Sequence, residues 1–147
     1  MHKIPFYPSH SKASMLFGIV HMDLLGPYRI PSRSRSHFFI VDDFSRSTWA
    51  YLLLQKSDVA GTVKEYVAYI ETQFDTKIKC VRTDNGKEFL NQVCGEYFSF
   101  KGIVHQLTIS YTPEQNGRVE RKHRHLMETA RSMMINACLP KLSLIHI

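Results

Sequence analysis

The segment that decides the fold is residues 37–54, HFFIVDDFSRSTWAYLLL. Its two apolar runs, residues 37–41 and 48–54, have the length and the aromatic and β-branched content of buried strands. The joint between them, DDFSRS, is short and polar. A short joint of this kind returns the second strand alongside the first, so we predict an antiparallel hairpin here.

The hairpin is extended by predicted elements on both sides. Residues 16–25, LFGIVHMDLL, form an apolar run that Gly26 and Pro27 end, and with the hairpin they predict an antiparallel meander of three strands. From Ser57, a plausible N-cap, the apolar residues recur at helical spacing as far as about Phe74. The later segments are predicted as a strand at 78–82, a helix at 89–100, a strand at 103–107 and a helix at 116–137. This order predicts an α/β domain with a central mixed five-stranded sheet flanked by helices.

Composition and charge favour a globular domain with an anionic partner. The 147 residues are 44% hydrophobic, which suits one packed domain, and the formal net charge is +6. Basic side chains displace condensed counterions from nucleic acid, so nucleic acid is the first partner to consider. A basic protein without such a partner remains an open alternative on charge alone. No signal peptide and no apolar stretch of about 20 residues occurs, so we expect no membrane association.

The three cysteines do not predict a metal or disulfide site. Cys80, Cys94 and Cys138 are widely spaced and odd in number, and no CxxC pair occurs. We therefore expect buried thiols in a reducing compartment and no zinc site in this chain.

Three acidic residues, each in its own local motif, are the strongest candidates for chemistry. They are Asp23 in HMDLLGP, Asp84 in RTDNGKEF and Glu120 in TPEQNGRVERKH. Asp23 and Asp84 are predicted at the carboxyl ends of strands, where α/β sheets tend to bind ligands. Carboxylates from separate segments can together hold Mg²⁺ for phosphoryl transfer.

Each acid also has a local explanation. Asp23 could cap the turn that follows its strand, and Asp84 lies in Asp-Asn-Gly, which is ordinary turn chemistry. Glu120 could pair with Arg124 one helical turn further on. Taken singly, therefore, none of the three acids identifies a site.

The combination of motifs resembles the catalytic core of retroelement integrases, specifically the copia-type branch. The resemblance runs from about Gly18 to Pro140. It is carried by HMDLLGP (21–27), FFIVDDFSRSTWAYLL (38–53), RTDNGKEF (82–89), GIVHQLTISYTPEQNGRVERKHRHLMETAR (102–131) and the Cys138-Leu139-Pro140 end.

The resemblance implies a ribonuclease H-like fold and a catalytic, metal-binding triad of Asp23, Asp84 and Glu120. Asp23 would lie on the central strand and bridge two Mg²⁺ (or Mn²⁺) ions. The implied reaction is processing of DNA 3′ ends and their joining to target DNA by phosphodiester transfer. Asp42 and Asp43, the main alternative acids, are implied to be structural and near Arg46.

The loop and basic helix around Glu120 are implied to contact DNA. The alternatives are a plain N-cap at Asn116 and a solvated basic helix, and for Glu88 we expect a surface or supporting role rather than metal binding. The Trp49, Tyr51, Phe38 and Phe39 rings are expected in the core rather than as base-stacking platforms. The candidate DNA-binding residues are Tyr111, Gln115, Asn116, Gly117, Arg118, Arg121, Lys122 and Arg124.

The ends of the chain depart from the family pattern. We expect a linker remnant at 1–14, the catalytic core at 15–140, and a tail at 141–147, KLSLIHI, that does not match the family. The family's upstream zinc module and downstream DNA-binding region have no counterpart, which favours a fragment of a retrotransposon polyprotein.

Several functional readings therefore stay open. The resemblance implies DNA ends and target DNA as partners, homo-oligomers, and action in the nucleus, with the cytoplasm as the alternative. The competing functions are a transposase or nuclease of the same fold, and a catalytically inactive nucleic-acid-binding remnant.

Overall fold

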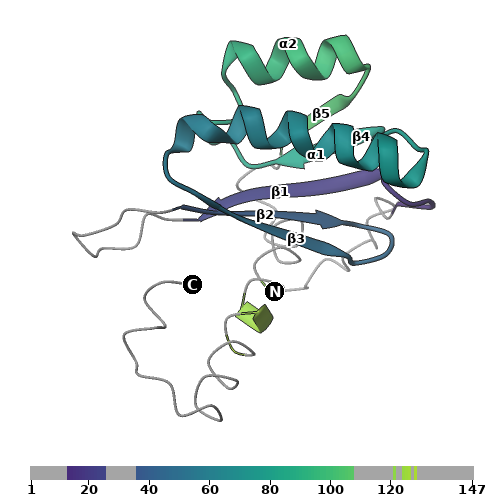
Figure 1. Ribbon diagram of the computed structural model, residues 1–147, viewed down its shortest axis with the longest axis horizontal. Helices are drawn as coiled ribbons and strands as arrows, with labels where there is room; N and C mark the ends of the chain where they lie inside the picture. The colour runs from purple at the N-terminus through teal and green to yellow at the C-terminus, as the bar shows by residue number, and fades with distance from the viewer. Residues whose placement is uncertain (1–12, 26–35, 108–120, 122–123, 127, 129–147) are drawn as a thin grey trace, which may run out of the picture. The chain divides into compact units, whose positions relative to one another are not determined.

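A mixed five-stranded sheet is the centre of the computed structural model (Figure 1). The structure describes residues 13–25, 36–107, 121, 124–126 and 128. The strands are β1 (Ile19–Leu25), β2 (Ser36–Asp42), β3 (Thr48–Leu53), β4 (Cys80–Thr83) and β5 (Val104–Leu107). Their order across the sheet is β3-β2-β1-β4-β5, so β1 is the central strand, as the resemblance implied.

The first three strands form the predicted antiparallel meander. In the hairpin, Ile40 on β2 lies opposite Trp49 on β3, and β1 pairs antiparallel with the other edge of β2, with Asp23 opposite Phe39. The two remaining pairs, β1 with β4 and β4 with β5, are parallel. The prediction of a mixed five-stranded sheet with helices is therefore confirmed.

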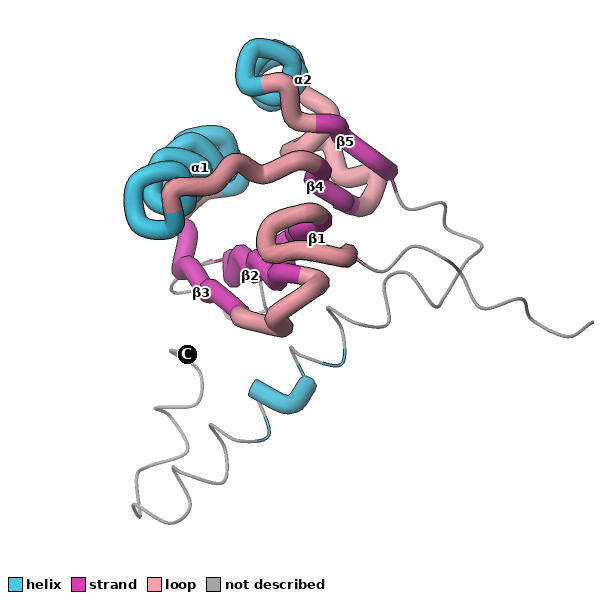
Figure 2. Tube along the Cα trace, turned by 90° about the vertical axis from the view of Figure 1, so that its right-hand side faces the viewer, coloured by secondary structure: helices cyan, strands magenta, loops and turns pink. Residues whose placement is uncertain are grey.

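Two helices in this part of the chain lie on the same side of the sheet (Figures 1 and 2). Helix α1 (Val59–Phe74) follows a single 3₁₀ turn, η1 (Lys56–Asp58). The predicted start at Ser57 is therefore slightly early, because the 3₁₀ turn intervenes and Asp58 occupies the N-cap position. The predicted apolar stripe of α1 is buried: Val59, Val63, Tyr66, Val67 and Ile70.

Helix α2 (Gln92–Lys101) is bounded by two residues with clear physical roles. The Asn91 side chain accepts a hydrogen bond from the Cys94 N–H (2.8 Å), which satisfies a donor in the first turn and sets the start later than the predicted residue 89. At the other end Gly102 has a φ of 69°, the left-handed conformation that glycine adopts without steric cost.

The hydrophobic core fills the space between the sheet and the two helices. Phe38 is fully buried in this core, and Trp49 and Tyr51 pack partly buried against it. Phe39 is buried outside this cluster, so all four rings are structural, as expected. The Trp49 ring meets the buried Tyr66 ring edge to face, with centroids 5.2 Å apart.

Two of the three cysteines are buried free thiols, Cys80 and Cys94. Burial raises the pKa of both thiols, which keeps them protonated and unreactive at neutral pH. Cys138 lies outside the described residues.

The chain divides into two compact units, residues Met1–Ile109 and Ser110–Ile147. Every element above belongs to the first unit. In the second unit the described residues Arg121, Arg124, His125, Leu126 and Glu128 are all helical and exposed, within the range predicted for the last helix. Among the described residues, no helix combines the length and apolar character needed to cross a membrane.

Candidate active site

The two central parallel strands carry two of the candidate acids toward the same edge of the sheet. His21 on β1 is the partner of Arg82 on β4, and two residues further along each strand direction are Asp23 and Asp84. Neighbouring strands lie about 4.8 Å apart, and residues two positions apart point to the same face. The paired positions end at His21 and Arg82, and the same register continued past the end of β4 would align Asp23 with Asp84, which 60 residues separate in the sequence.

The Asp84 carboxylate is oriented by the turn that follows β4. Its Oδ1 accepts a hydrogen bond from the Gly86 N–H (3.0 Å), which is the Asx-turn chemistry expected of Asp-Asn-Gly. The backbone carbonyl of Asp84 accepts a hydrogen bond from the Thr83 hydroxyl (2.8 Å). Asp84 is half-buried, so one part of the carboxylate is fixed by the backbone while the residue remains partly accessible.

Two carboxylates approach Gly86 closely. A Cβ built there would lie 2.7 Å from Glu88 Oε1 and 2.9 Å from Asp84 Oδ1. The two oxygens therefore approach the same point, and Glu88 folds back towards Asp84. This agrees with the expected supporting role of Glu88, whose carboxylate lies near the candidate site.

The end of β4 is tied to the edge strand β5 on both faces of the sheet. On the helix side, His105 Nε2 lies 2.9 Å from Thr83 Oγ1. The hydroxyl donates its single proton to the Asp84 carbonyl, so the ring nitrogen is the donor in this contact. Burial lowers the pKa of His105, which favours the neutral ring. On the other face, Arg82 donates to Gln106 Oε1 from Nε (3.3 Å) and Nη2 (2.9 Å).

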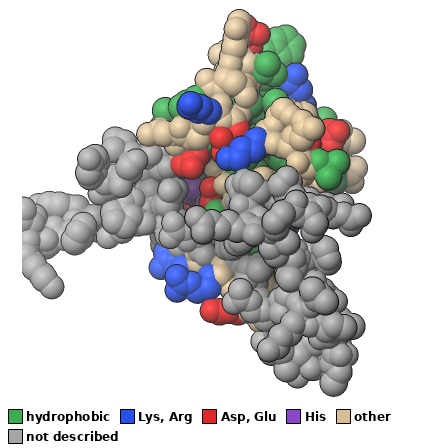
Figure 3. Space-filling model, turned by 90° about the vertical axis from the view of Figure 1, so that its left-hand side faces the viewer, with side chains coloured by type: hydrophobic (Ala, Val, Ile, Leu, Met, Phe, Trp, Pro, Cys, Tyr) green, Lys and Arg blue, Asp and Glu red, His purple; other side chains and the backbone are tan. Residues whose placement is uncertain are grey.

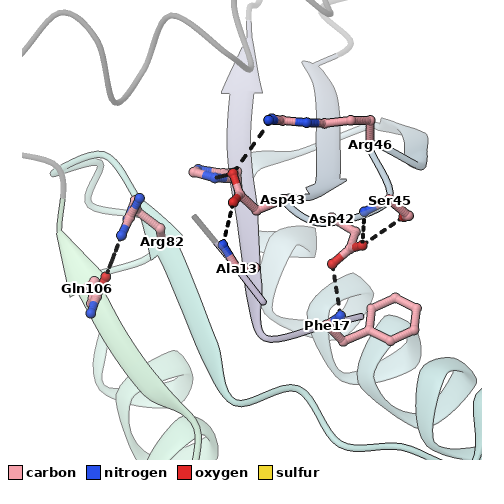
Figure 4. Close-up of polar contacts among 9 residues, drawn as sticks. Ala13, Phe17, Asp42, Asp43, Ser45, Arg46, Arg82 and Gln106 are labelled. Carbon is pink, nitrogen blue, oxygen red and sulfur yellow. Dashed lines mark hydrogen bonds and ion pairs between the residues drawn. The ribbon is translucent and has the colours of Figure 1, made fainter. Parts of the chain in front are cut away.

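Asp42 anchors the start of β1 to the end of β2 (Figure 4). It is fully buried and accepts hydrogen bonds from the Phe17 N–H (2.9 Å) and from the Ser45 N–H and hydroxyl (2.8 and 2.7 Å). Both oxygens of this carboxylate therefore accept hydrogen bonds from inside the protein.

Asp43 extends the same anchor. Its carboxylate contacts the Ala13 N–H (2.8 Å), His21 Nε2 (3.0 Å) and Arg46 Nη1 (3.6 Å). The implied structural role of this acid pair near Arg46 is confirmed, and the pair holds in place the strand that carries Asp23.

Figure 3 views the molecule from the side at which β1 ends, and acidic, basic and histidine side chains gather near the centre of this face. Glu120 lies outside the described residues, so of the predicted triad the structure describes Asp23 and Asp84, which belong to or follow adjacent strands of the sheet. Of the predicted DNA-binding residues, Arg121 and Arg124 are described, exposed and helical. The others lie outside the described residues: Tyr111, Gln115, Asn116, Gly117, Arg118 and Lys122.

The described donors suit a hard divalent cation only in part. Asp23 and Asp84 supply the carboxylate oxygens that Mg²⁺ prefers. Within residues 13–25 and 36–107, no group of three acidic, histidine or cysteine side chains has metal-binding geometry. A two-acid pair of this kind requires a third carboxylate and substrate oxygens to complete a coordination shell.

The sequence did not indicate the residues that support this pair. The Arg82–Gln106 contact joins positions 24 apart, and the Thr83–His105 contact joins positions 22 apart. Neither spacing carries a local signal. The sequence indicated only that the short predicted strand before Asp84 needs a neighbouring strand, and it did not identify the contacting residues on that neighbour.

The comparisons with known proteins agree with this fold. The integrase core domain family matches residues 14–113, and the chain belongs to this family. A retrovirus-related Pol polyprotein from transposon TNT 1-94 of Nicotiana tabacum is 35% identical over 142 residues, covering 95% of this chain and 11% of the polyprotein. The Pol polyprotein from transposon RE1 of Arabidopsis thaliana is 37% identical over 140 residues, covering 95% of this chain and 9% of the polyprotein.

This chain thus corresponds to a small part of retrotransposon polyproteins. Solved structures show the fold. A chain in the cryo-EM structure of the simian T-cell lymphotropic virus intasome in complex with PP2A regulatory subunit B56 gamma has a TM-score of 0.72 at 20% identity, covering 99% of this chain and 51% of that one. The HTLV-2 integrase catalytic core domain in complex with magnesium (trimeric form) has a TM-score of 0.65 at 20% identity, covering 92% and 84%. The fold is therefore that of ribonuclease H-like integrase cores.

Proposed function

We propose that the chain is the catalytic core of a divalent-metal-dependent DNA strand transferase that processes DNA 3′ ends and joins them to target DNA. The observation that carries this proposal is the parallel pairing of β1 with β4, whose register, continued beyond His21 and Arg82, would align Asp23 with Asp84. Membership of the integrase core family supports it, as does the magnesium named for the HTLV-2 relative.

Asp23, Asp84 and Glu120 are the residues that would hold Mg²⁺ or Mn²⁺, with two ions expected when DNA is bound. The ions would supply activation of the attacking oxygen and stabilisation of the leaving oxygen. The protein's own contribution is orientation. The Gly86 N–H fixes one Asp84 oxygen, and the anchor formed by Asp43 holds β1 against β2.

The two chemical steps are in-line displacements at phosphorus. In the first, a water oxygen bonds to phosphorus, the 3′ oxygen leaves with its electron pair and takes up a proton, and a 3′-hydroxyl results. In the second, that hydroxyl attacks a phosphodiester of the target, and the displaced oxygen leaves as a new 3′ end. No covalent intermediate with the protein is required in either step.

DNA is the proposed partner, both as element ends and as target. The exposed helical residues Arg121 and Arg124 support it, since cationic side chains on one helix suit a polyanion. The remaining predicted contacts, Tyr111, Gln115, Asn116, Gly117, Arg118 and Lys122, belong to this proposal. We also propose homo-oligomers, in line with the trimeric form and the intasome named for the relatives, and action in the nucleus, where the DNA target resides.

The proposal is tested by cleavage and strand joining on short DNA duplexes with Mg²⁺ or Mn²⁺. We expect activity that Asp84→Asn and Glu120→Gln each abolish, because one carboxylate oxygen donor is replaced by a neutral amide. Asp75→Asn is the matched control, since Asp75 is exposed in a left-handed conformation that asparagine tolerates. Activity that survives both changes would exclude the metal assignment. Salt-sensitive DNA binding without metal-dependent chemistry would favour the inactive remnant.

A further inference from the structure

Arg82 is a buried cation whose hydrogen-bond partner is neutral. The residue is 7% exposed, on β4 between β1 and β5. Its Nε and Nη2 groups point to the amide oxygen of Gln106 (Figure 4). No ion pair joins it to a carboxylate within the described part of the chain. Charged groups this deeply buried are normally paired with an opposite charge, so the Arg82 environment is incomplete.

The contrast with Arg46 sharpens this observation. Arg46 has a side chain that is 43% exposed and nevertheless contacts the buried carboxylate of Asp43. Arg82 is far less exposed, and its side-chain partner among the described residues is the neutral Gln106. A guanidinium carries five N–H donors, and the Gln106 oxygen accepts from two of its nitrogens. The remaining donors are available to an anion with several acceptor oxygens.

The location of Arg82 indicates which anion this would be. Arg82 precedes Asp84 by two residues, and its cross-strand partner His21 precedes Asp23 by two. Side chains two apart on a strand share a face, with a spacing of about 6.6 Å. The positively charged Arg82 thus lies two residues before Asp84 along the chain, towards the start of β4. A DNA strand whose phosphodiester reaches Asp23 and Asp84 carries neighbouring phosphates at this distance scale.

We propose that Arg82 binds a backbone phosphate of the DNA strand adjacent to the bond that is cut, and that Gln106 positions its guanidinium for this. The inference rests on the proposed function, because it uses the DNA strand expected at Asp23 and Asp84. A planar guanidinium matches the oxygens of a phosphate in a two-point contact, which a lysine ammonium does not. Gln106 suits the positioning role because its neutral oxygen orients the guanidinium without cancelling its charge.

The sharpest test keeps Arg82 and changes its neighbour. Gln106→Glu has nearly the same shape and gives the guanidinium a carboxylate partner, so the fold is preserved while the positive charge is neutralised. We expect DNA affinity to fall roughly tenfold and the slope of log affinity against log salt to shrink by about 0.9, the value of one phosphate contact. Gln73→Glu is the matched control, because Gln73 is an exposed residue of α1, and this variant should bind as the wild type does.

A second variant separates charge from geometry. Arg82→Lys keeps the charge and loses the planar donor set, so we expect the salt slope to be retained and the affinity to fall severalfold. Binding is measured with Ca²⁺ in place of Mg²⁺, so that no cleavage occurs. Unchanged affinity and slope in Gln106→Glu would overturn the proposal. If Gln106→Glu changes the Mg²⁺ dependence of activity but leaves DNA binding unaltered, the proposal is overturned as well. Arg82 would then serve only to balance the negative charge of Asp23 and Asp84.

The outcome for Arg82 is distinguishable from that for the proposed function. Loss of chemistry in the wild type would refute the function while the DNA-binding measurements still report on Arg82. If the chain binds no DNA, titration with inorganic phosphate followed through the Arg82 Nε–H NMR signal decides the matter. A shift in the wild type that Gln106→Glu abolishes supports the phosphate site, and no shift in the wild type overturns it.

Discussion

The substitution Gly86→Ala provides a direct test of how Asp84 is oriented. The added Cβ would stand 2.9 Å from Asp84 Oδ1 and 2.7 Å from Glu88 Oε1. The Glu88 side chain is long and can rotate away at small cost. The Asp84 oxygen is held by the Gly86 N–H at 3.0 Å, so it must retreat by about half an ångström to reach an ordinary van der Waals separation.

A retreat of that size stretches the hydrogen bond to the limit of a useful length, and the carboxylate loses its fixed orientation. Losing one such bond at a half-buried site costs about 1 kcal/mol of unfolding free energy. The effect on activity is larger, because a misplacement of about 1 Å at a reacting centre can cost roughly 100-fold in rate. For half that displacement we expect a rate about tenfold lower, and a higher Mg²⁺ concentration for half-maximal activity.

The assay is strand joining on a labelled duplex across a Mg²⁺ titration, with thermal unfolding of the same samples. Gly95→Ala is the matched control, since a Cβ there meets nothing within 4 Å. Adding Glu88→Ala to Gly86→Ala should not restore the rate if Asp84 is the displaced group. A Gly86→Ala protein with the wild-type rate and Mg²⁺ response would refute the reasoning, and rescue by Glu88→Ala would transfer the effect to Glu88.

Two further predictions concern stability. Gly61→Ala in α1 should raise the unfolding free energy by roughly 0.5–1 kcal/mol, because the new Cβ meets nothing within 4 Å and alanine restricts the unfolded chain. Gly102→Ala should lower it by about 1 kcal/mol, because alanine is strained at a φ of 69°. Urea unfolding measures both, and equal effects would contradict the different backbone conformations of the two glycines. Burial lowers the pKa of His105 in the folded protein, so as the pH falls the unfolded chain takes up the proton first. The neutral His105 ring therefore contributes fully to the unfolding free energy above about pH 6.5, and this contribution is lost as the pH falls towards the folded pKa. Urea unfolding at pH 7.5 and 5.0 should show a smaller loss in His105→Gln, and an equal loss would count against this sign.

Local patterns in the sequence were sufficient for the element types and for the hairpin. The hydrophobic periodicity of strands and helices is a property of neighbouring residues. Residues 37–54 therefore predicted the two paired strands that the structure contains. The boundaries shifted where a local cap intervened, as at Asp58 and Asn91, because caps depend on a few hydrogen bonds that periodicity does not report. The motifs around Asp23 and Asp84 were likewise recognisable in the sequence alone.

The relation between distant segments depended on the packed sheet. The sequence placed Asp23 and Asp84 at strand ends, but the parallel pairing of β1 with β4, which directs both toward one edge of the sheet, is set by collective packing. The same pairing leaves Arg82 buried against Gln106, 24 positions away, with no carboxylate partner in the described residues. The residue types and local motifs of a candidate site can thus be identified from the sequence alone. The alignment of those motifs, and the charge left uncompensated beside them, arise only when burial brings separate strands together.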